Sequence, residues 1–244
     1  MHAIAPSSAT RRPRFARWIL LCATLVLALL AGRDLLGRRR TDIRVFDAAQ
    51  VAQLDTDMWR SYYDRKPALL FLQLAELMRG QFHFPLLRSY VAAARSARAA
   101  FVFKDGRERS DYERALPDLE AYYHMIRDVS ASPFDVHRTA ALELEWWIVH
   151  RERSRHPAGD LERSLADAAA ALYGVPASAL KDYARERTVA MVLRDTREAA
   201  GGVSERDWEE IARHLHAAWA SLSAAVRPAT PPESVASRRE IPPL

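Results

Sequence analysis

The stretch Ser204–Val226, SERDWEEIARHLHAAWASLSAAV, repeats apolar residues every three or four positions. This spacing is the period of an α-helix that buries one face. Ser204 and Asp207 place a capping hydroxyl and an acidic residue at its start. The stretch therefore predicts a long amphipathic helix. Its apolar stripe consists of Trp208, Ile211, Leu215, Trp219, Leu222 and Val226.

The same period recurs upstream, and Pro, Gly and capping residues divide it into further helices. Asp47 and Asp160 are expected to cap two of them, and Ser110 with Glu113 is expected to form a capping box for a third. Glycine is scarce, with 8 in 244 residues, and strand-like alternation is absent. The sequence predicts an all-α, compact bundle of seven or eight helices joined by short loops. The expected ranges are 47–66, 67–80, 85–105, a helix from 110 that Pro117 kinks or divides, 132–156, 160–174, 176–200 and 204–226.

An apolar run, WILLCATLVLALLAG at Trp18–Gly32, precedes the body and has arginines on both sides. It predicts one N-terminal transmembrane helix over residues 15–36 that acts as an uncleaved signal anchor. A cleaved signal peptide is the alternative, because the run also fits the length of its apolar region. The small residues near the end of the run do not fall two apart, which disfavours cleavage. Cys22, the one cysteine, lies inside the run, so no disulfide is expected.

Charge and composition divide the chain into five segments. Residues 1–44 hold nine arginines and two aspartates, so they carry +7, and the rest of the chain carries −2 of the +5 total. The basic excess lies beside the apolar run, where it suits anionic lipid, and the body has none for nucleic acid. The predicted segments are a basic tail (1–14), the anchor (15–36), a basic juncture (37–44), the helical domain (45–226) and a disordered Pro-rich tail (227–244).

No signature of a catalytic nucleophile, a phosphate-binding loop or a metal site occurs, so we expect no cofactor and no metal, and an enzyme is the less favoured class. Glu143, Trp147 and His150 recur at helical spacing on one face. Glu143 and His150 are the catalytic candidates, because a buried acid–base pair would have shifted pKa values. The candidate ligand-binding residues, as pocket walls, are Tyr62, Tyr122, Tyr123 and Trp147.

Two function hypotheses follow. The first is a membrane-tethered helical interaction or scaffold domain that binds a partner protein or copies of itself. The alternative is a membrane-associated enzyme or small-ligand binder with a polar pocket between helices. The expected partner of the anchor is the lipid bilayer, and nucleic acid is not expected. Both flanks of the anchor are rich in arginine, so the side on which the body lies stays open.

Three motifs carry a resemblance: MWRSYYDR at Met58–Arg65, LELEWW at Leu142–Trp147 and LYGVP at Leu172–Pro176. Over about residues 43–226 the chain resembles an uncharacterised family of bacterial membrane-anchored helical proteins. The resemblance implies a bacterial source, one helical unit and, with the anchor, a single-pass protein of the bacterial inner (cytoplasmic) membrane. No activity, cofactor or partner comes with it.

Overall fold

The structure is a computed structural model that describes residues 12–37 and 40–228. Within these residues no strand forms, and one isolated bridge pairs Thr41 with Ser130. The all-α prediction is confirmed. The helices are α1 (Arg12–Leu36), α2 (Ala48–Tyr63), α3 (Pro67–Phe82), α4 (Leu86–Asp105), α5 (Arg109–Tyr112), η1 (Glu113–Ala115), α6 (Leu116–Val129), α7 (Val136–Arg151), η2 (Arg153–Arg155), α8 (Asp160–Tyr173), η3 (Ala177–Leu180), α9 (Lys181–Ala199) and α10 (Glu205–Val226).

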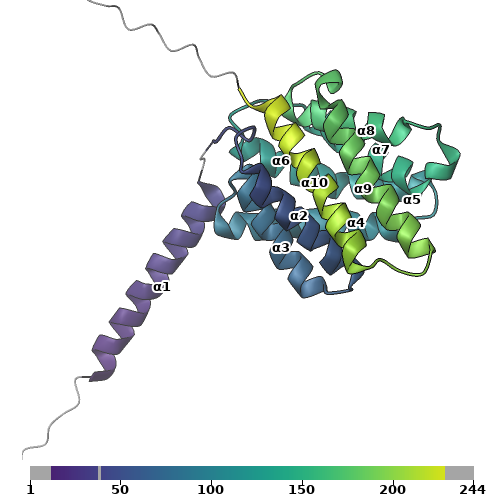
Figure 1. Cartoon of the computed structure of the whole chain (residues 1–244). Helices are drawn as coiled ribbons and strands as arrows, with labels where there is room; N and C mark the ends of the chain where they lie inside the picture. Colours follow the sequence, from purple (N-terminus) through teal and green to yellow (C-terminus); the bar gives the residue numbers. More distant parts are fainter. Residues whose placement is uncertain (1–11, 38–39, 229–244) are drawn as a thin grey trace, which may run out of the picture.

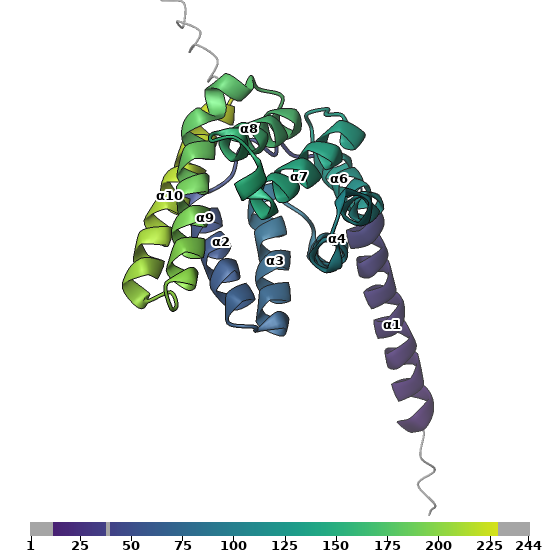
Figure 2. The same ribbon diagram turned by 90° about the vertical axis from the view of Figure 1, so that its right-hand side faces the viewer.

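The body contains eight helices of at least 14 residues and the single turn α5, in agreement with the predicted seven or eight. Each long helix packs on the next along the chain, and α10 packs back on α2, so the neighbours form a closed ring (Figures 1 and 2). The apolar faces turn into this ring, and the largest core joins residues from all eight long helices. A smaller core lies between α9 and α10.

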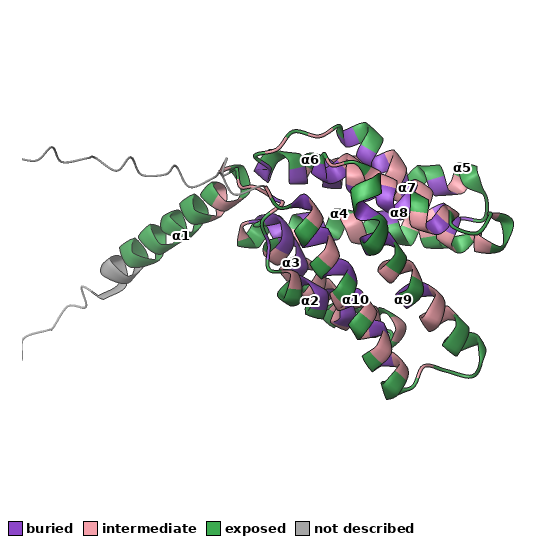
Figure 3. Ribbon diagram, turned by 45° about the horizontal axis from the view of Figure 1, so that its top comes forward, coloured by how far each residue is buried: buried purple, intermediate pink, exposed green. Residues whose placement is uncertain are grey.

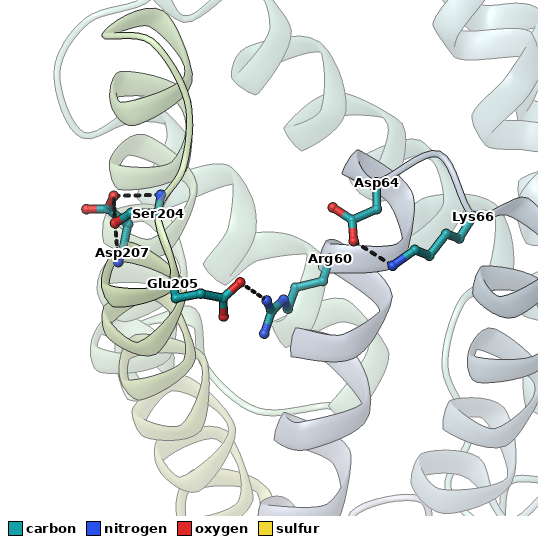
Figure 4. A network of polar contacts seen from close by, with 6 residues as sticks. All are labelled: Arg60, Asp64, Lys66, Ser204, Glu205 and Asp207. Atoms are coloured by element: carbon teal, nitrogen blue, oxygen red, sulfur yellow. Dashed lines mark hydrogen bonds and ion pairs between the residues drawn. The ribbon is translucent and has the colours of Figure 1, made fainter.

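Two helix starts follow the sequence directly. The Asp47 carboxylate accepts hydrogen bonds from the backbone N–H groups of Ala49 and Gln50, which would otherwise lack partners. Ser204 and Asp207 form the reciprocal capping box that opens α10 (Figure 4). Beside it, Arg60 of α2 donates to Glu205 at 2.5 Å and links the end of one helix to the start of the other (Figure 4).

Two predicted caps are wrong. Ser110 lies inside α5, and its hydroxyl donates to the Glu108 carboxylate instead of accepting from the backbone. Asp160 is the first residue of α8 and not its cap, because Gly159 takes a positive φ of 89° and turns the chain one residue earlier. The predicted break near Pro117 is present: a 3₁₀ turn precedes α6, and Pro117 occupies its first turn.

The first helix projects from the body as a rod, and its exposed side chains contrast with the mixed burial of the other helices (Figures 1 and 3). Its 25 residues span about 37 Å. The stretch Arg17–Leu36 has a mean hydropathy of 2.1, and none of it is buried against the body. By length and composition this helix can cross a bilayer, although a signal sequence has the same properties.

The end of α1 is clamped to α4. The Asp34 carboxylate accepts from the backbone N–H groups of Leu87 and Arg88, at 3.0 and 3.1 Å, in the first turn of α4. The Arg88 side chain in turn donates to the carbonyls of Leu35 and Gly37 at 2.6 and 2.9 Å. Each helix therefore satisfies terminal backbone groups of the other, and this contact fixes α1 against the body.

The segment after α1, predicted as a basic juncture, is also held against the helical body. Thr41 exchanges backbone hydrogen bonds with Val129 and Ala131, both at 2.8 Å. Ile43 and Phe46 are buried in the core. The predicted tail at 1–14, up to residue 11, and the predicted disordered tail, from residue 229, lie outside the described residues.

Candidate functional site

A cavity of about 180 Å³ lies inside the ring, and we call it the central cavity. All eight long helices contribute to its wall, so its shape depends on closure of the whole ring. The half-buried residues Leu74, Ser96 and Trp146, from α3, α4 and α7, lie where the wall meets solvent. Its polar and aromatic lining residues are Asp55, Gln81, Phe82, Ser96, Tyr122, Tyr123, Glu143, Trp146, Tyr173, Tyr183, Arg187 and Trp219.

On one wall, a carboxylate and a guanidinium are paired. Asp55 of α2 is 3% exposed and accepts from Arg187 of α9 at 2.5 Å and from the indole N–H of Trp219 at 2.8 Å. The guanidinium carbon of Arg187 lies 5.7 Å from the ring centroids of both Trp59 and Trp219. Burial acts to lower the pKa of Arg187, but the carboxylate of Asp55 outweighs it and the pKa is raised. The arginine therefore stays charged.

On another part of the wall, Glu143 of α7 has neutral partners. One carboxylate oxygen accepts from the Tyr123 hydroxyl at 3.0 Å, and the other accepts from the indole N–H of Trp147 at 3.1 Å. Neither partner carries a positive charge. Among the described residues, no Lys, Arg or His pairs with Glu143 at ion-pair distance.

Four tyrosines complete the polar lining. Tyr173 accepts from the Gln81 amide at 2.7 Å, and the Tyr122 hydroxyl donates to the Met78 sulfur at 3.2 Å. Burial raises the pKa of Tyr122 and Tyr123 well above the usual value, and the charge of Glu143 adds to this. Burial also raises the pKa of Tyr173 and Tyr183. At neutral pH all four phenols therefore keep their protons and serve as hydrogen-bonding groups.

Three of the predicted candidates, Tyr122, Tyr123 and Glu143, line the central cavity. Trp147 lies behind Glu143 and holds its carboxylate without lining the cavity. Tyr62 is 50% exposed, stacks edge-on against Tyr63 and is absent from the wall. The structure thus brings Glu143 and two of the three predicted wall tyrosines together at the central cavity.

The structure does not bring His150 to this site. Its Nε2 lies 3.2 Å from the Asp195 carboxylate of α9, which also accepts from Arg153 at 3.1 Å. Burial acts to raise the pKa of Asp195, but hydrogen bonds and charge from His150 and Arg153 outweigh it and lower the pKa. His150 follows Glu143 by seven positions along α7. The helical spacing predicts a shared face, but the His150 side chain contacts α9 and does not line the central cavity.

Sequence reasoning missed Asp55 and Arg187, although each leaves a signal. Asp55 lies between Val51 and Met58 on the apolar face of α2, and Arg187 follows Tyr183 on the buried face of α9. A charge at a core position of a helix is costly unless it is paired. Two such charges of opposite sign predict a buried pair, but they do not say that a cavity lies beside it.

A second, more open pocket of about 520 Å³ lies between α8, η3 and α9. Two of its basic side chains have acidic partners, Arg163 with Asp160 and Arg185 with Asp182. It offers no buried polar group comparable to those of the central cavity. In the described part of the chain, no three His, Cys, Asp or Glu side chains gather so as to hold a metal ion.

The central cavity can bind and orient a small molecule through hydroxyl, amide, carboxylate and aromatic groups. No nucleophile paired with a base is present on its wall. No protein-family model, curated protein or solved structure matches the chain.

Proposed function

We propose that this chain is a membrane-anchored helical domain that binds a small ligand in the central cavity. The observation that carries the proposal is the Glu143 carboxylate, which lines the cavity and is held there by Tyr123 and Trp147. A carboxylate has about four lone-pair sites, and these two donors use one on each oxygen, so Glu143 can still accept from a polar occupant of the cavity. Binding sites commonly combine aromatic walls with a few fixed polar groups.

The size of the cavity limits the ligand. An apolar cavity of about 150 Å³ holds one benzene molecule, and the central cavity measures about 180 Å³. The ligand is therefore a single ring or a short chain with one polar head. Several water molecules fill the same volume when the ligand is absent, because the wall supplies the partners they need.

The proposed location is the inner membrane of a bacterium, with α1 as a single-pass anchor in the bilayer. The length and exposure of α1 support this, as do the arginines on both of its flanks. The clamp between Asp34 and α4 supports a rigid connection between anchor and body. The full-length chain should stay in the membrane fraction after alkaline carbonate extraction. Recovery of a soluble chain that lacks residues 1–32 would contradict the anchor.

Ligand binding is tested by closing the cavity. Ala169 lines it from α8, and Ala169→Leu adds a side chain into the space. The full-length protein in non-ionic detergent is screened by thermal unfolding against small polar metabolites. A ligand at 100 times its Kd adds about 2.7 kcal/mol to the stability of the native protein, and Ala169→Leu should abolish this gain. The proposal fails if no compound stabilises the native protein more than it stabilises Ala169→Leu.

A second candidate function is self-association, which a different surface favours. The outer face of α4 carries an apolar stripe in which Val91 is 44% and Phe101 is 60% exposed, together with Leu87. The clamp holds α4 beside the end of α1 (Figure 2), where copies tethered in one bilayer meet side by side. The partner would be a second copy of the chain.

Cross-linking in native membranes tests this second candidate. Phe101→Ser should reduce the dimer fraction, because it removes the most exposed aromatic residue of the stripe. Val189→Ser on α9 is the matched control, since Val189 is 38% exposed on another helix. An unchanged dimer fraction in Phe101→Ser, or no dimer in the native protein, removes self-association.

A further inference from the structure

The charges on the wall of the central cavity do not balance. Three charged side chains line it: Asp55, Glu143 and Arg187. Counted as two carboxylates and one guanidinium, they leave one negative charge in excess. Arg187 is committed to Asp55 at 2.5 Å, so the excess charge resides at Glu143.

The Asp55–Arg187 pair shows how the interior of this protein accommodates a cation. Arg187 lies over the rings of Trp59 and Trp219 and pairs with a buried carboxylate. Aromatic faces attract cations through the ring quadrupole, and the attraction grows when water is excluded. A carboxylate next to aromatic faces is thus a cation-binding environment within this protein.

The surroundings of Glu143 have a similar composition, but among the described residues no cation lies at ion-pair distance from it. Arg187 is within electrostatic reach of Glu143 but is paired with Asp55. Tyr122 and Tyr123 feel the charge of Glu143, and their rings meet edge-on with centroids 5.1 Å apart; Trp146 of α7 also lines the cavity. A carboxylate has about four lone-pair sites, and Tyr123 and Trp147 use one on each oxygen. Lone pairs therefore remain on both oxygens for a charged donor.

We propose that the central cavity takes a small organic cation, an ammonium group on a compact apolar body, whose charge is balanced by Glu143. This inference rests on the proposed ligand-binding function and names the class of its ligand. The ammonium donates to Glu143, and the apolar body lies against the tyrosine rings and the aliphatic residues of α8. The volume of about 180 Å³ admits one ring or a short branched chain.

The test is a titration of the full-length protein in non-ionic detergent with three probes of one shape: benzylammonium, benzyl alcohol and benzoate. Calorimetry measures each affinity on the native chain, on Glu143→Gln and on Glu145→Gln. Glu145 is the matched control, because it lies two residues away on α7 and pairs with Arg109 outside the cavity. Ala169→Leu reports whether binding occurs in the cavity.

Benzylammonium should bind the native chain at least about tenfold more tightly than benzyl alcohol, a difference of about 1.4 kcal/mol. Glu143→Gln should weaken it by a similar factor, while Glu145→Gln should leave it unchanged. If Glu143→Gln does not fold, the ranking of the three probes on the native chain still decides.

Two outcomes overturn the inference in distinguishable ways. If benzyl alcohol or benzoate binds as tightly as benzylammonium, and Ala169→Leu abolishes that binding, the cavity is a ligand site but not a cation site. If no probe binds, or if Ala169→Leu leaves all binding intact, the inference fails, and the metabolite screen on the native chain and Ala169→Leu decides the proposed function separately.

Discussion

Asp55 and Glu143 line the same cavity, yet the protein holds the two carboxylates in different ways. Asp55 is almost fully buried, and an arginine and an indole N–H satisfy one of its oxygens. Glu143 is half-buried, and a phenol and another indole donate to it, with no positive side chain of the described residues at ion-pair distance. Asp55 is therefore part of the framework that closes the ring, whereas Glu143 is the carboxylate that we propose binds the ligand.

The difference follows from what burial demands. A fully buried charge is tolerated only with a partner of opposite sign, because desolvation costs several kcal/mol for each ion. A half-buried carboxylate keeps contact with water and can be held by neutral donors at lower cost. We therefore infer separate roles for the two acids that line the cavity: Asp55 in stability and, under the proposed function, Glu143 in binding.

Asp55→Asn and Glu143→Gln give the most direct test of this contrast. Asp55→Asn leaves Arg187 buried without a counter-ion and should lower the free energy of unfolding by about 3–5 kcal/mol. Glu143→Gln keeps the shape and one acceptor, so it should cost about 1 kcal/mol or less. Urea unfolding of the full-length protein in non-ionic detergent, followed by tryptophan fluorescence, measures both values.

A control distinguishes the missing counter-ion from lost packing. Asp55→Leu combined with Arg187→Met removes both charges together, and such replacements are often neutral or stabilising. The double variant should therefore be more stable than Asp55→Asn. Equal losses in Asp55→Asn and Glu143→Gln would show that the two carboxylates have the same role.

Trp219 donates to Asp55 and Trp147 donates to Glu143. Removing these two donors tests the same contrast with smaller expected losses of stability. Trp219→Phe removes the buried N–H bond to Asp55, and hydrogen bonds to charged groups are worth about 1.5–3 kcal/mol. Trp147→Phe removes the bond to Glu143, where water can replace the donor, so the loss should be about 1 kcal/mol or less. Thermal unfolding of both variants in one detergent ranks the two losses of stability. A larger loss in Trp147→Phe than in Trp219→Phe would contradict this prediction.

Local sequence signals predicted the fold well, because helix periodicity and caps act over a few residues. Asp47, Pro67 and the Ser204–Asp207 pair lie at helix starts as expected. The signal failed at Asp160, where Gly159 competes for the same turn. Closure of the ring by α10 on α2 joins segments more than 140 residues apart, as the Arg60–Glu205 pair does, and no local pattern encodes such a contact.

The candidate site was predictable only in part for the same reason. Tyr122, Tyr123 and Glu143 were chosen for chemistry and helical facing, and those properties are local. His150 shares a helix with Glu143 but meets Asp195 of α9, because the position of α9 is set by tertiary packing. Arg187 reaches Asp55 across 132 residues of chain. A sequence can indicate that such a charge needs a partner, but not which partner the fold supplies.

Tyr123 and Tyr183 should contribute to the loss of stability at alkaline pH over different pH ranges. Tyrosines of the unfolded chain ionise near pH 10, whereas burial raises the pKa of both Tyr123 and Tyr183 in the folded protein. Above about pH 10 the unfolded state then binds fewer protons than the folded state, so stability is complete below that pH and falls as pH rises.

Each such tyrosine contributes at most about 1.4 kcal/mol per pH unit to this loss. The charge of Glu143 raises the pKa of both tyrosines, but Arg187 acts to lower the pKa of Tyr183, whereas no positive charge offsets the rise at Tyr123. Tyr123→Phe should therefore flatten the alkaline loss over a wider pH range than Tyr183→Phe. Urea unfolding at a series of alkaline pH values measures both slopes. If Tyr183→Phe flattens the loss over the same pH range, Arg187 does not offset the negative charges near Tyr183.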